Sequence, residues 1–483
     1  MKSEGFELML GWSMSAGFKI LTKAAVPSAF YDYHSHEFDV PRCHENTRVS
    51  VLEKVGDWVN LVIDFTAFVM WLYGAAGAGK SAIARTMAEI LHSRQQLLAT
   101  FFFSRADPLR NHIRSVIPTL AYNIILSVPE SLPFITHKIE QDPHIFQRPF
   151  EHQLRQIILE PLQMLFQQNG LLLQTVIVID GLDECLNHEE RVTLLHAISI
   201  NAAQYFVPLK FLITSRPEVP IARVFDSTPV VGVSARHSLD DEPESMEDVE
   251  YFLSAKFDEI KRTHPSKRHI PHDWPSSHVK ADLAQKSSGQ FIYPATIIRY
   301  ISSPRHNPML RLDVVLRLRP LSGESPFAQL DALYKYILLS CGDVEMALRI
   351  IGMCLLSTQR IHVPWCKSDI IEGFLSETTT PENTEIILGL HLGDVQRGLE
   401  DLGSLIEYKS DDIPLRVLHA SLFDFLSDPT RFSGLPFSLA AIHIDLAVWC
   451  SYLDARHGNV QIENLQCESD ILYRLFLSWE RAP

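Results

Sequence analysis

The sequence predicts an α/β protein whose first half forms a parallel, doubly wound sheet. Three observations carry this prediction: continuous apolar runs alternate with amphipathic segments, a turn rich in glycine and alanine follows one run, and a later run ends in acidic residues. Strands of a parallel sheet are covered on both faces, so they appear as unbroken apolar stretches separated by helices. The alternation fades after residue 235, and the rest of the chain is predicted to be mostly helical.

Each element of this half has a local signal. A helix is expected over residues 46–59, capped by Thr47, because apolar residues recur there at helical spacing. Pro118 is expected to kink a helix over residues 113–126. The acidic stretch 240–248 is interpreted as a linker. The predicted strands are 68–73, 97–104, 171–180 and 209–215, and a further helix is expected over 81–94.

Composition limits the class of protein. The chain has 483 residues, 46% of them hydrophobic, which is enough apolar material for about two to four domains. A net charge of −15 argues against general nucleic-acid binding, which depends on clustered Lys and Arg. Seven scattered cysteines without a C-x-x-C pair indicate free thiols in a reducing compartment. No apolar run reaches the roughly 18 residues of a membrane span, so we expect a cytoplasmic protein without one.

The turn after the first predicted strand carries the most specific signal. A strand precedes it and a helix follows it, as the phosphate loop G-x-x-x-x-G-K-[ST] requires. Small residues let backbone N–H groups approach phosphate oxygens, Lys80 adds a point charge, and the Ser81 hydroxyl is a ligand for Mg²⁺. Only four positions are constrained, so a chance match is the alternative. The residues are Gly74, Ala75, Ala76, Gly77, Ala78, Gly79, Lys80 and Ser81.

Two later strand ends supply candidate catalytic groups. Asp180 ends an apolar run and is predicted to hold Mg²⁺, while Asp183 or Glu184 is predicted to orient or deprotonate the attacking water. The alternative is a solvated acidic turn. Arg216 follows another predicted strand, and it is expected either to sense the γ-phosphate or to form a structural ion pair.

At these motifs the sequence resembles the NACHT family of P-loop ATPases, within the STAND class of signal-transducing proteins, and its fungal branch in particular. The resemblance extends to the segment before the first strand, to residues 101–124 and to two helical stretches near residues 287–301 and 415–429. It implies a P-loop NTPase core followed by a helical domain and a winged-helix-like domain.

The resemblance also implies roles for three further residues. Thr47 and Arg48 would lie near the adenine, and His419 would contact the β-phosphate of bound ADP; a structural helix histidine is the alternative for His419. Two positions depart from the family pattern. Ala420 stands where many relatives have Asp, and Phe291 stands where relatives often have a proline that contacts adenine.

The expected domains follow from these segments. Relatives usually carry effector and repeat domains. We therefore expect that protein partners supply these domains, or that the chain is a truncated gene model. The resemblance also implies a nucleotide-dependent homo-oligomer. The predicted divisions are 1–45, an N-terminal linker or truncated effector region; 46–235, the NACHT core; 236–320, the helical domain; 321–440, the winged-helix-like domain; and 441–483, a truncated C-terminal helical segment.

The predicted function is a nucleotide-operated signalling switch. Mg²⁺-ATP, with GTP as the alternative nucleotide, would bind at Gly74 to Ser81, and slow hydrolysis would reset a closed, ADP-bound state. Two alternatives remain: a nucleotide-binding scaffold without turnover, and a P-loop kinase, which would need an acceptor pocket and a lid with converging arginines.

Overall fold

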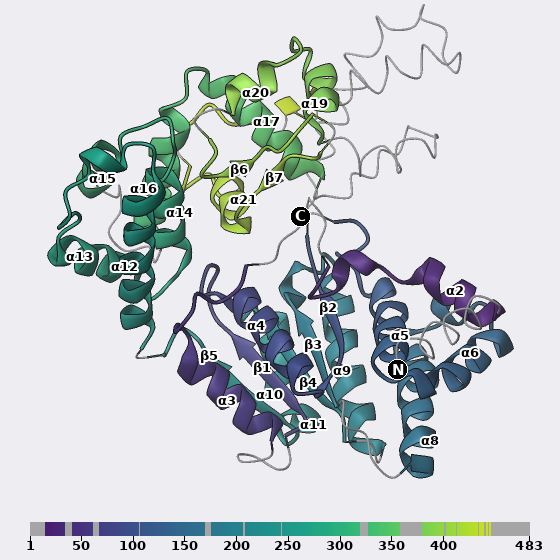
Figure 1. Cartoon of the computed structure of the whole chain (residues 1–483). Helices are drawn as coiled ribbons and strands as arrows, with labels where there is room; N and C mark the ends of the chain where they lie inside the picture. The colour runs from purple at the N-terminus through teal and green to yellow at the C-terminus, as the bar shows by residue number, and fades with distance from the viewer. Residues whose placement is uncertain are drawn as a thin grey trace, which may run out of the picture. The chain divides into compact units, whose positions relative to one another are not determined.

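The five-stranded sheet in the first half of the chain confirms the predicted fold class (Figure 1). All of its strand pairs are parallel, in the order β2-β3-β4-β1-β5. The four strands expected from apolar runs are all present. The strands are β1 (Val69–Tyr73), β2 (Leu97–Phe102), β3 (Val176–Asp180), β4 (Lys210–Ser215) and β5 (Ser234–Ser238).

The chain is described here by a computed structural model that divides into two contact-dense units. The first unit holds residues 1–258 and 275–294, and the second unit holds residues 259–274 and 295–483. The described residues are 15–33, 41–60, 67–105, 107–169, 175–205, 208–242, 244–318, 327–357, 379–399, 402–411, 413–432, 434–438, 441–442 and 444–445. The predicted strand residues 171–174 and most of the predicted C-terminal segment lie outside them.

Strand β5 was not indicated by the sequence. Its residues, SARHS, are mostly polar and only partly buried, so they lack the apolar signature of the other strands. The strand is nevertheless paired with β1, with Val69 opposite Ser234 and Tyr73 opposite Ser238. It is an edge strand, and polar side chains are tolerated there because one side of the strand has no neighbour to bury them.

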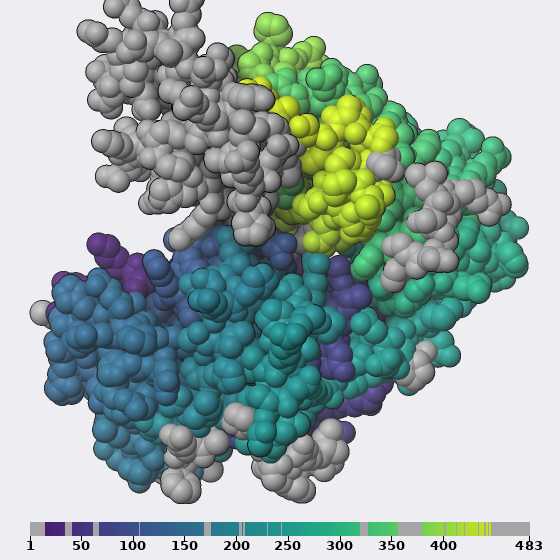
Figure 2. Space-filling view, turned by 180° about the vertical axis from the view of Figure 1, so that it is seen from behind, coloured from purple at the N-terminus to yellow at the C-terminus, as the bar shows by residue number. Residues whose placement is uncertain are grey.

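Helices cover both faces of the sheet, and alternate strand residues serve the two faces. Met70 and Leu72 of β1 pack with α3 (Val49–Val59) and α4 (Lys80–Ser93). Val69 and Trp71 pack with the larger layer, which is formed by α2 (Ala16–Ala24), α5 (Val116–Ser127), α6 (Leu132–Gln141) and the helices that follow. Figure 1 shows the strands between these layers, and the blue and teal surface in Figure 2 is the larger layer seen from outside. The arrangement is the doubly wound architecture that continuous apolar strands require.

Two local expectations in this unit are wrong. Thr47 does not cap the first helix, because α3 begins at Val49 and the capping position belongs to Arg48, whose backbone is left-handed (φ 58°). Pro118 does not kink a helix, because α5 begins only at Val116, which places the proline in the first turn where no helical N–H is lost.

The remaining elements of the first unit frame the sheet. Part of the predicted N-terminal linker is helical: α2 packs on α5 and α6, and its Leu21 is fully buried. The helices are α2 (Ala16–Ala24), α3 (Val49–Val59), α4 (Lys80–Ser93), α5 (Val116–Ser127), α6 (Leu132–Gln141), α7 (Phe150–Gln153), α8 (Glu160–Asn169), α9 (His188–Gln204), α10 (Val219–Asp226), α11 (Thr228–Val231), α12 (Ser245–Thr263), α13 (Ser277–Ser287) and α14 (Ile292–Ile301); α12 and α14 continue into the second unit.

The second unit is mostly helical, as expected. Helix α20 (Asp394–Gly398) is short, and it is followed by the strand β6 (Ile406–Glu407). A two-stranded antiparallel ribbon beside helices is compatible with a winged helix, and the predicted domain divisions stay predictions. Among the described helices, none is long and apolar enough to cross a bilayer. The elements are α15 (Pro308–Arg317), α16 (Ala328–Leu339), α17 (Val344–Ser357), α19 (Pro381–Leu388), α20 (Asp394–Gly398), β6 (Ile406–Glu407), β7 (Arg416–Val417) and α21 (Ala420–Ser427).

The central strand β4 should be sensitive to truncation. Leu212 is fully buried between β1 and β3, so Leu212→Ala is expected to lower the free energy of unfolding of the first unit by roughly 2–5 kcal/mol. Leu310→Ala is the matched control, because that leucine is 64% exposed and its loss should change stability by no more than about 0.5 kcal/mol. Urea unfolding followed by tryptophan fluorescence measures both, and equal stabilities would contradict the assigned core.

Candidate nucleotide-binding site

The sheet order brings the three predicted motifs to one edge. Strands β3, β4 and β1 are adjacent and parallel, and Tyr73 lies opposite Ser215 at their carboxyl ends. The glycine-rich loop, the acidic turn and Arg216 therefore begin side by side. Open parallel sheets bind ligands at this edge.

The loop between β1 and α4 has the backbone that its glycines allow. Gly77 and Gly79 have positive φ angles of 80° and 94°. A Cβ on Gly77 would also lie 2.1 Å from Cγ2 of Ile292, so the position excludes a side chain twice over. Helix α4 begins at Lys80, which leaves its first amides without acceptors inside the helix.

These features suit an anion. Among the described residues, none accepts a hydrogen bond from the amides of Gly77, Gly79, Lys80 or Ser81. Unpaired amides at a helix N-terminus bind phosphate groups well because the helix dipole adds positive potential there. The loop, including Ala76 and Ala78, is therefore shaped as a phosphate cradle.

Lys80 lies folded against the loop itself. Its Nζ donates hydrogen bonds to the carbonyl oxygens of Gly74 and Ala75, each at 2.8 Å. Burial lowers the pKa of Lys80, while the nearby carboxylates of Asp183 and Asp180 oppose that change. The ammonium thus lies at the loop, held by neutral carbonyls that a phosphate oxygen can replace.

Asp180 is the buried acid at the tip of β3. Its Oδ1 accepts a hydrogen bond from Oγ1 of Thr214 at 2.5 Å, and the Ser81 hydroxyl also bonds to this carboxylate. Burial raises the pKa of Asp180 to about 6, although both hydrogen bonds work against the rise. Thr214 then accepts from the Gly181 amide at 3.0 Å, which fixes the turn that follows.

The pair Ser81 and Asp180 fits the donor set of Mg²⁺. Mg²⁺ in nucleotide sites takes one or two protein oxygens, with phosphates and waters completing its coordination. Within the described part of the chain there is no group of three or more His, Cys, Asp or Glu that could hold a metal ion. A metal here would therefore depend on the oxygens of a bound nucleotide.

Asp183 and Arg216 are bonded to each other. The backbone amide of Arg216 donates to Oδ1 of Asp183 at 3.0 Å, and the side-chain Nε of Arg216 lies 3.1 Å from Oδ2 of Asp183. Asp183 is buried, and the guanidinium of Arg216 compensates its charge. The structure thus shows the ion-pair alternative for Arg216, and sensing of a γ-phosphate stays a prediction.

Glu184 has the higher of the two raised pKa values at this edge. Burial, with the charge of Asp183 beside it, raises the pKa of Glu184 to about 7. Its Oε2 accepts a hydrogen bond from the Arg105 amide at 3.0 Å, and Nη2 of Arg105 donates to the Asp183 carbonyl at 3.3 Å. A carboxylate that titrates near neutral pH is suited to proton transfer, so Glu184 is the better candidate for a base. Arg105 was not singled out from the sequence.

Arg48 holds the carbonyl side of the loop. Its guanidinium is 3% exposed and donates from Nη2 to the carbonyls of Ala78 at 2.9 Å and Gly289 at 3.3 Å. The same group lies 5.0 Å from the ring centroid of Phe291. Thr47, also buried, donates to the His44 carbonyl. The structure places Arg48 against the loop, and contact of Thr47 or Arg48 with a base stays a prediction.

Two acids of the segment 240–248 also reach the loop region, so its interpretation as a linker is wrong. Both oxygens of Asp240 accept from the Ala75 amide, at 3.0 and 3.1 Å. Asp248 accepts from the Arg48 amide at 2.9 Å. Sequence reasoning missed these contacts because an acidic run gives no signal that separates a fully solvated acid from one that accepts a hydrogen bond from a distant backbone amide.

His419 lies in the second unit, directly before α21. Its Nε2 is 3.0 Å from Nη1 of Arg299. Desolvation, together with the charges of Arg299 and Arg416, lowers the pKa of His419 and keeps it neutral. A contact between His419 and a nucleotide stays a prediction.

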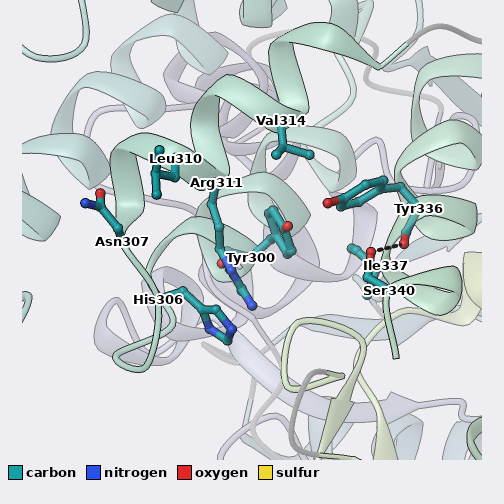
Figure 3. Close-up of a pocket in the computed structure, with 9 residues that line it drawn as sticks. All are labelled: Tyr300, His306, Asn307, Leu310, Arg311, Val314, Tyr336, Ile337 and Ser340. Atoms are coloured by element: carbon teal, nitrogen blue, oxygen red, sulfur yellow. Dashed lines mark hydrogen bonds between the residues drawn. The ribbon is translucent and has the colours of Figure 1, made fainter. Parts of the chain in front are cut away.

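A cavity of about 330 Å³ in the second unit contains none of the predicted site residues (Figure 3). Several of its polar groups are already bonded. Arg311 lies over the ring of Tyr300 and donates to the Tyr300 carbonyl at 2.6 Å, and Ser340 donates to the Tyr336 carbonyl at 2.7 Å. This cavity has no feature of a phosphate site.

The parallel sheet, the glycine-rich loop and the acid at the end of β3 together are the features of the P-loop NTPase fold. Comparison with known proteins narrows the class. Residues 53–216 match the family model described as Nephrocystin 3, N-terminal. The vegetative incompatibility protein HET-E-1 of Podospora anserina is 23% identical over 330 residues, which cover 67% of this chain and 22% of that protein. These matches support a NACHT-type P-loop NTPase, as the resemblance predicted, and the chain spans about a fifth of that relative's length.

Solved structures give more distant similarities. The Aeropyrum pernix ORC1 protein in complex with DNA has a TM-score of 0.35 and 12% identity, covering 85% of this chain and 95% of that chain. The Drosophila ORC bound to DNA has a TM-score of 0.32 and 13% identity, covering 90% and 92%. TM-scores this low carry no argument about this chain.

The raised pKa of Glu184 has a consequence for stability. A carboxyl whose pKa rises from 4.5 to about 7 on folding binds its proton more tightly in the folded state. Without nucleotide or metal, stability should therefore fall as pH rises between these values, by on the order of 1–3 kcal/mol. Glu184→Gln should reduce this slope to the part that the raised pKa of Asp180 contributes, and it should be the more stable protein at pH 8; urea unfolding at pH 5 and pH 8 measures both. The same slope in both proteins would contradict the assignment.

Proposed function

We propose that this protein is a nucleotide-operated switch that binds Mg²⁺-ATP, with GTP as the alternative, and hydrolyses it slowly. The observation that carries the proposal is the loop at Gly74 to Ser81. Its amides at Gly77, Gly79, Lys80 and Ser81 have no acceptor among the described residues, and they lie beside the Ser81–Asp180 hydrogen bond. This arrangement offers donors for phosphates and oxygens for a metal in one place. Bound Mg²⁺ would neutralise charge on the phosphates.

The chain's own residues would act in distinct ways. The amides of the loop would bind the phosphates, and Lys80 would move from the Gly74 and Ala75 carbonyls onto phosphate oxygens. Ser81 and Asp180 would hold the metal. Glu184 would accept a proton from the attacking water, since its pKa of about 7 leaves a substantial fraction ionised at neutral pH. Asp183 would hold Arg216 in place near the γ-phosphate.

The switch itself would lie in the contacts between the loop and the segments that lead to the second unit. The Ile292 amide donates to the Gly77 carbonyl, and Arg48 joins the Ala78 carbonyl to Gly289. Helices α12 and α14, which begin near these contacts, continue into the second unit. A change in the loop would bias the positions of these helices. The same proposal includes an ADP-bound state in which His419 contacts the β-phosphate. It also includes a nucleotide-dependent homo-oligomer, protein partners and a cytoplasmic location.

Two substitutions test binding and turnover separately. Lys80→Ala is expected to weaken binding of fluorescent ATP or GTP analogues at least about tenfold, because it removes the only cation in the loop. Glu184→Gln should bind nucleotide normally but release phosphate about 10²–10⁴ times more slowly. Lys19→Ala, which removes an exposed lysine of α2, is the control. If the wild-type protein binds nucleotide but releases no phosphate, it is a scaffold without turnover. If it binds neither ATP nor GTP, the proposal is wrong.

Asp240 should act as a positioning residue for the loop. Asp240→Ala removes the acceptor of the Ala75 amide, so the nucleotide dissociation constant is expected to rise about tenfold, while Asp240→Asn, which keeps one oxygen, should have a smaller effect. Glu244→Gln alters an exposed acid of the same segment and serves as the control. Binding titrations and the thermal midpoint are measured together. An unchanged dissociation constant in Asp240→Ala would contradict this role.

A further inference from the structure

A second cavity in the first unit, of about 440 Å³, lies apart from the phosphate loop. Its walls come from the turn before α5, the turn before α7, the end of α7, and the first turn of α9. The volume falls within the range of small-molecule sites, which runs from about 300 to 1,000 Å³. Six of its residues carry the argument: Ile113, Arg114, Phe146, Phe150, Gln153 and Glu190.

Two opposite charges line this cavity without pairing. The exposed guanidinium of Arg114 makes no hydrogen bond or ion pair among the described residues. Glu190 uses one oxygen, Oε2, to accept from the Ile113 amide at 3.0 Å and from the Cys185 thiol at 3.7 Å. Within the described chain its other oxygen, Oε1, accepts nothing. The cavity therefore presents a free cation and a free carboxylate oxygen.

A buried acceptor adds to this pattern. Gln153 is 5% exposed, and its Nε2 donates to the carbonyls of Phe146 at 3.3 Å and Arg148 at 2.7 Å. Those two bonds fix which end of the amide is nitrogen and which is oxygen. Its Oε1 is buried and accepts no hydrogen bond among the described residues. A buried acceptor without a donor is unfavourable.

Apart from Gln147 and from Arg148, which is paired with Asp142, the rest of the lining is apolar. Ile113 and Phe150 are buried and Phe146 is half-buried, so they offer aliphatic and aromatic surface between the polar groups. A simple anion would leave the free oxygen of Glu190 unmet, and a simple amine would leave Arg114 unmet. A zwitterion with an apolar body meets the cation, the carboxylate oxygen and the apolar surface together, because its carboxylate pairs with Arg114 and its ammonium donates to Oε1 of Glu190.

We propose that this cavity binds a free α-amino acid with a large apolar side chain. The inference does not rest on nucleotide binding, because none of these residues belongs to the phosphate loop, the acidic turn or their partners. Lys80→Ala is therefore expected to bind the amino acid as the wild type does.

The test uses the full chain, L-phenylalanine as the probe, and isothermal titration calorimetry. Phenethylamine, which lacks the carboxylate, and N-acetyl-L-phenylalanine, which lacks the ammonium, should each bind at least about tenfold more weakly. Arg114→Ala should weaken L-phenylalanine about tenfold but leave phenethylamine unchanged. Glu190→Gln should weaken L-phenylalanine but leave N-acetyl-L-phenylalanine unchanged. Arg155→Ala, an exposed arginine of the stretch that follows α7, is the matched control.

Three results would overturn the proposal. One is the absence of binding by L-phenylalanine, L-leucine and L-methionine at millimolar concentrations in a wild-type protein with a normal thermal midpoint. Another is equal affinity for L-phenylalanine and both analogues, which would show that the charges are not recognised. The third is unchanged binding in both Arg114→Ala and Glu190→Gln, which would place the amino acid elsewhere.

Discussion

The buried carboxylate of Asp180 is the constraint on which the site depends. A carboxylate at the tip of a central strand must be hydrogen-bonded, because an unmet charge in that position is costly. Its partners are Thr214 on β4 and Ser81 on α4, so the Asp180 side chain connects the end of β3 to the end of β4 and to the first turn of α4. The adjacency of β3, β4 and β1 in the sheet is what makes those partners available.

The phosphate loop is held on one side and open on the other. Its carbonyls are tied by Arg48, Lys80 and the Ile292 amide, whereas its inner amides have no acceptor among the described residues. The asymmetry follows from the two left-handed glycines, which turn successive amides to the same side. The loop can therefore bind an anion without first breaking hydrogen bonds of its own backbone amides. Only the two hydrogen bonds from the Lys80 ammonium to loop carbonyls have to be exchanged.

The three acids of this edge have different environments and different uses. Asp180 is bonded to hydroxyls, Asp183 to a guanidinium, and Glu184 to a single backbone amide. Hydrogen bonds and positive charge favour the ionised form, and burial favours the neutral form. The negative charge of Glu184 is compensated least, and its pKa is the higher of the two raised values. This distinguishes Glu184, the candidate base, from Asp180 and Asp183, which bond to hydroxyls and to a guanidinium.

The sequence by itself determined the parts of this protein that local chemistry specifies. Strands such as Val69–Tyr73 and Val176–Asp180 could be predicted because strands covered on both faces are continuously apolar, and the loop because a phosphate cradle admits only small residues beside one lysine. The polar edge strand Ser234–Ser238, the pairing of Asp183 with Arg216, and the contacts of Asp240 and Arg48 with the loop required the tertiary structure. Asp240 bonds to an amide 165 residues away, and such a partner is chosen by the order of the strands and the packing of helices on them. Local sequence carries no record of that choice, because an acid in solvent and an acid that holds a backbone amide are the same residue.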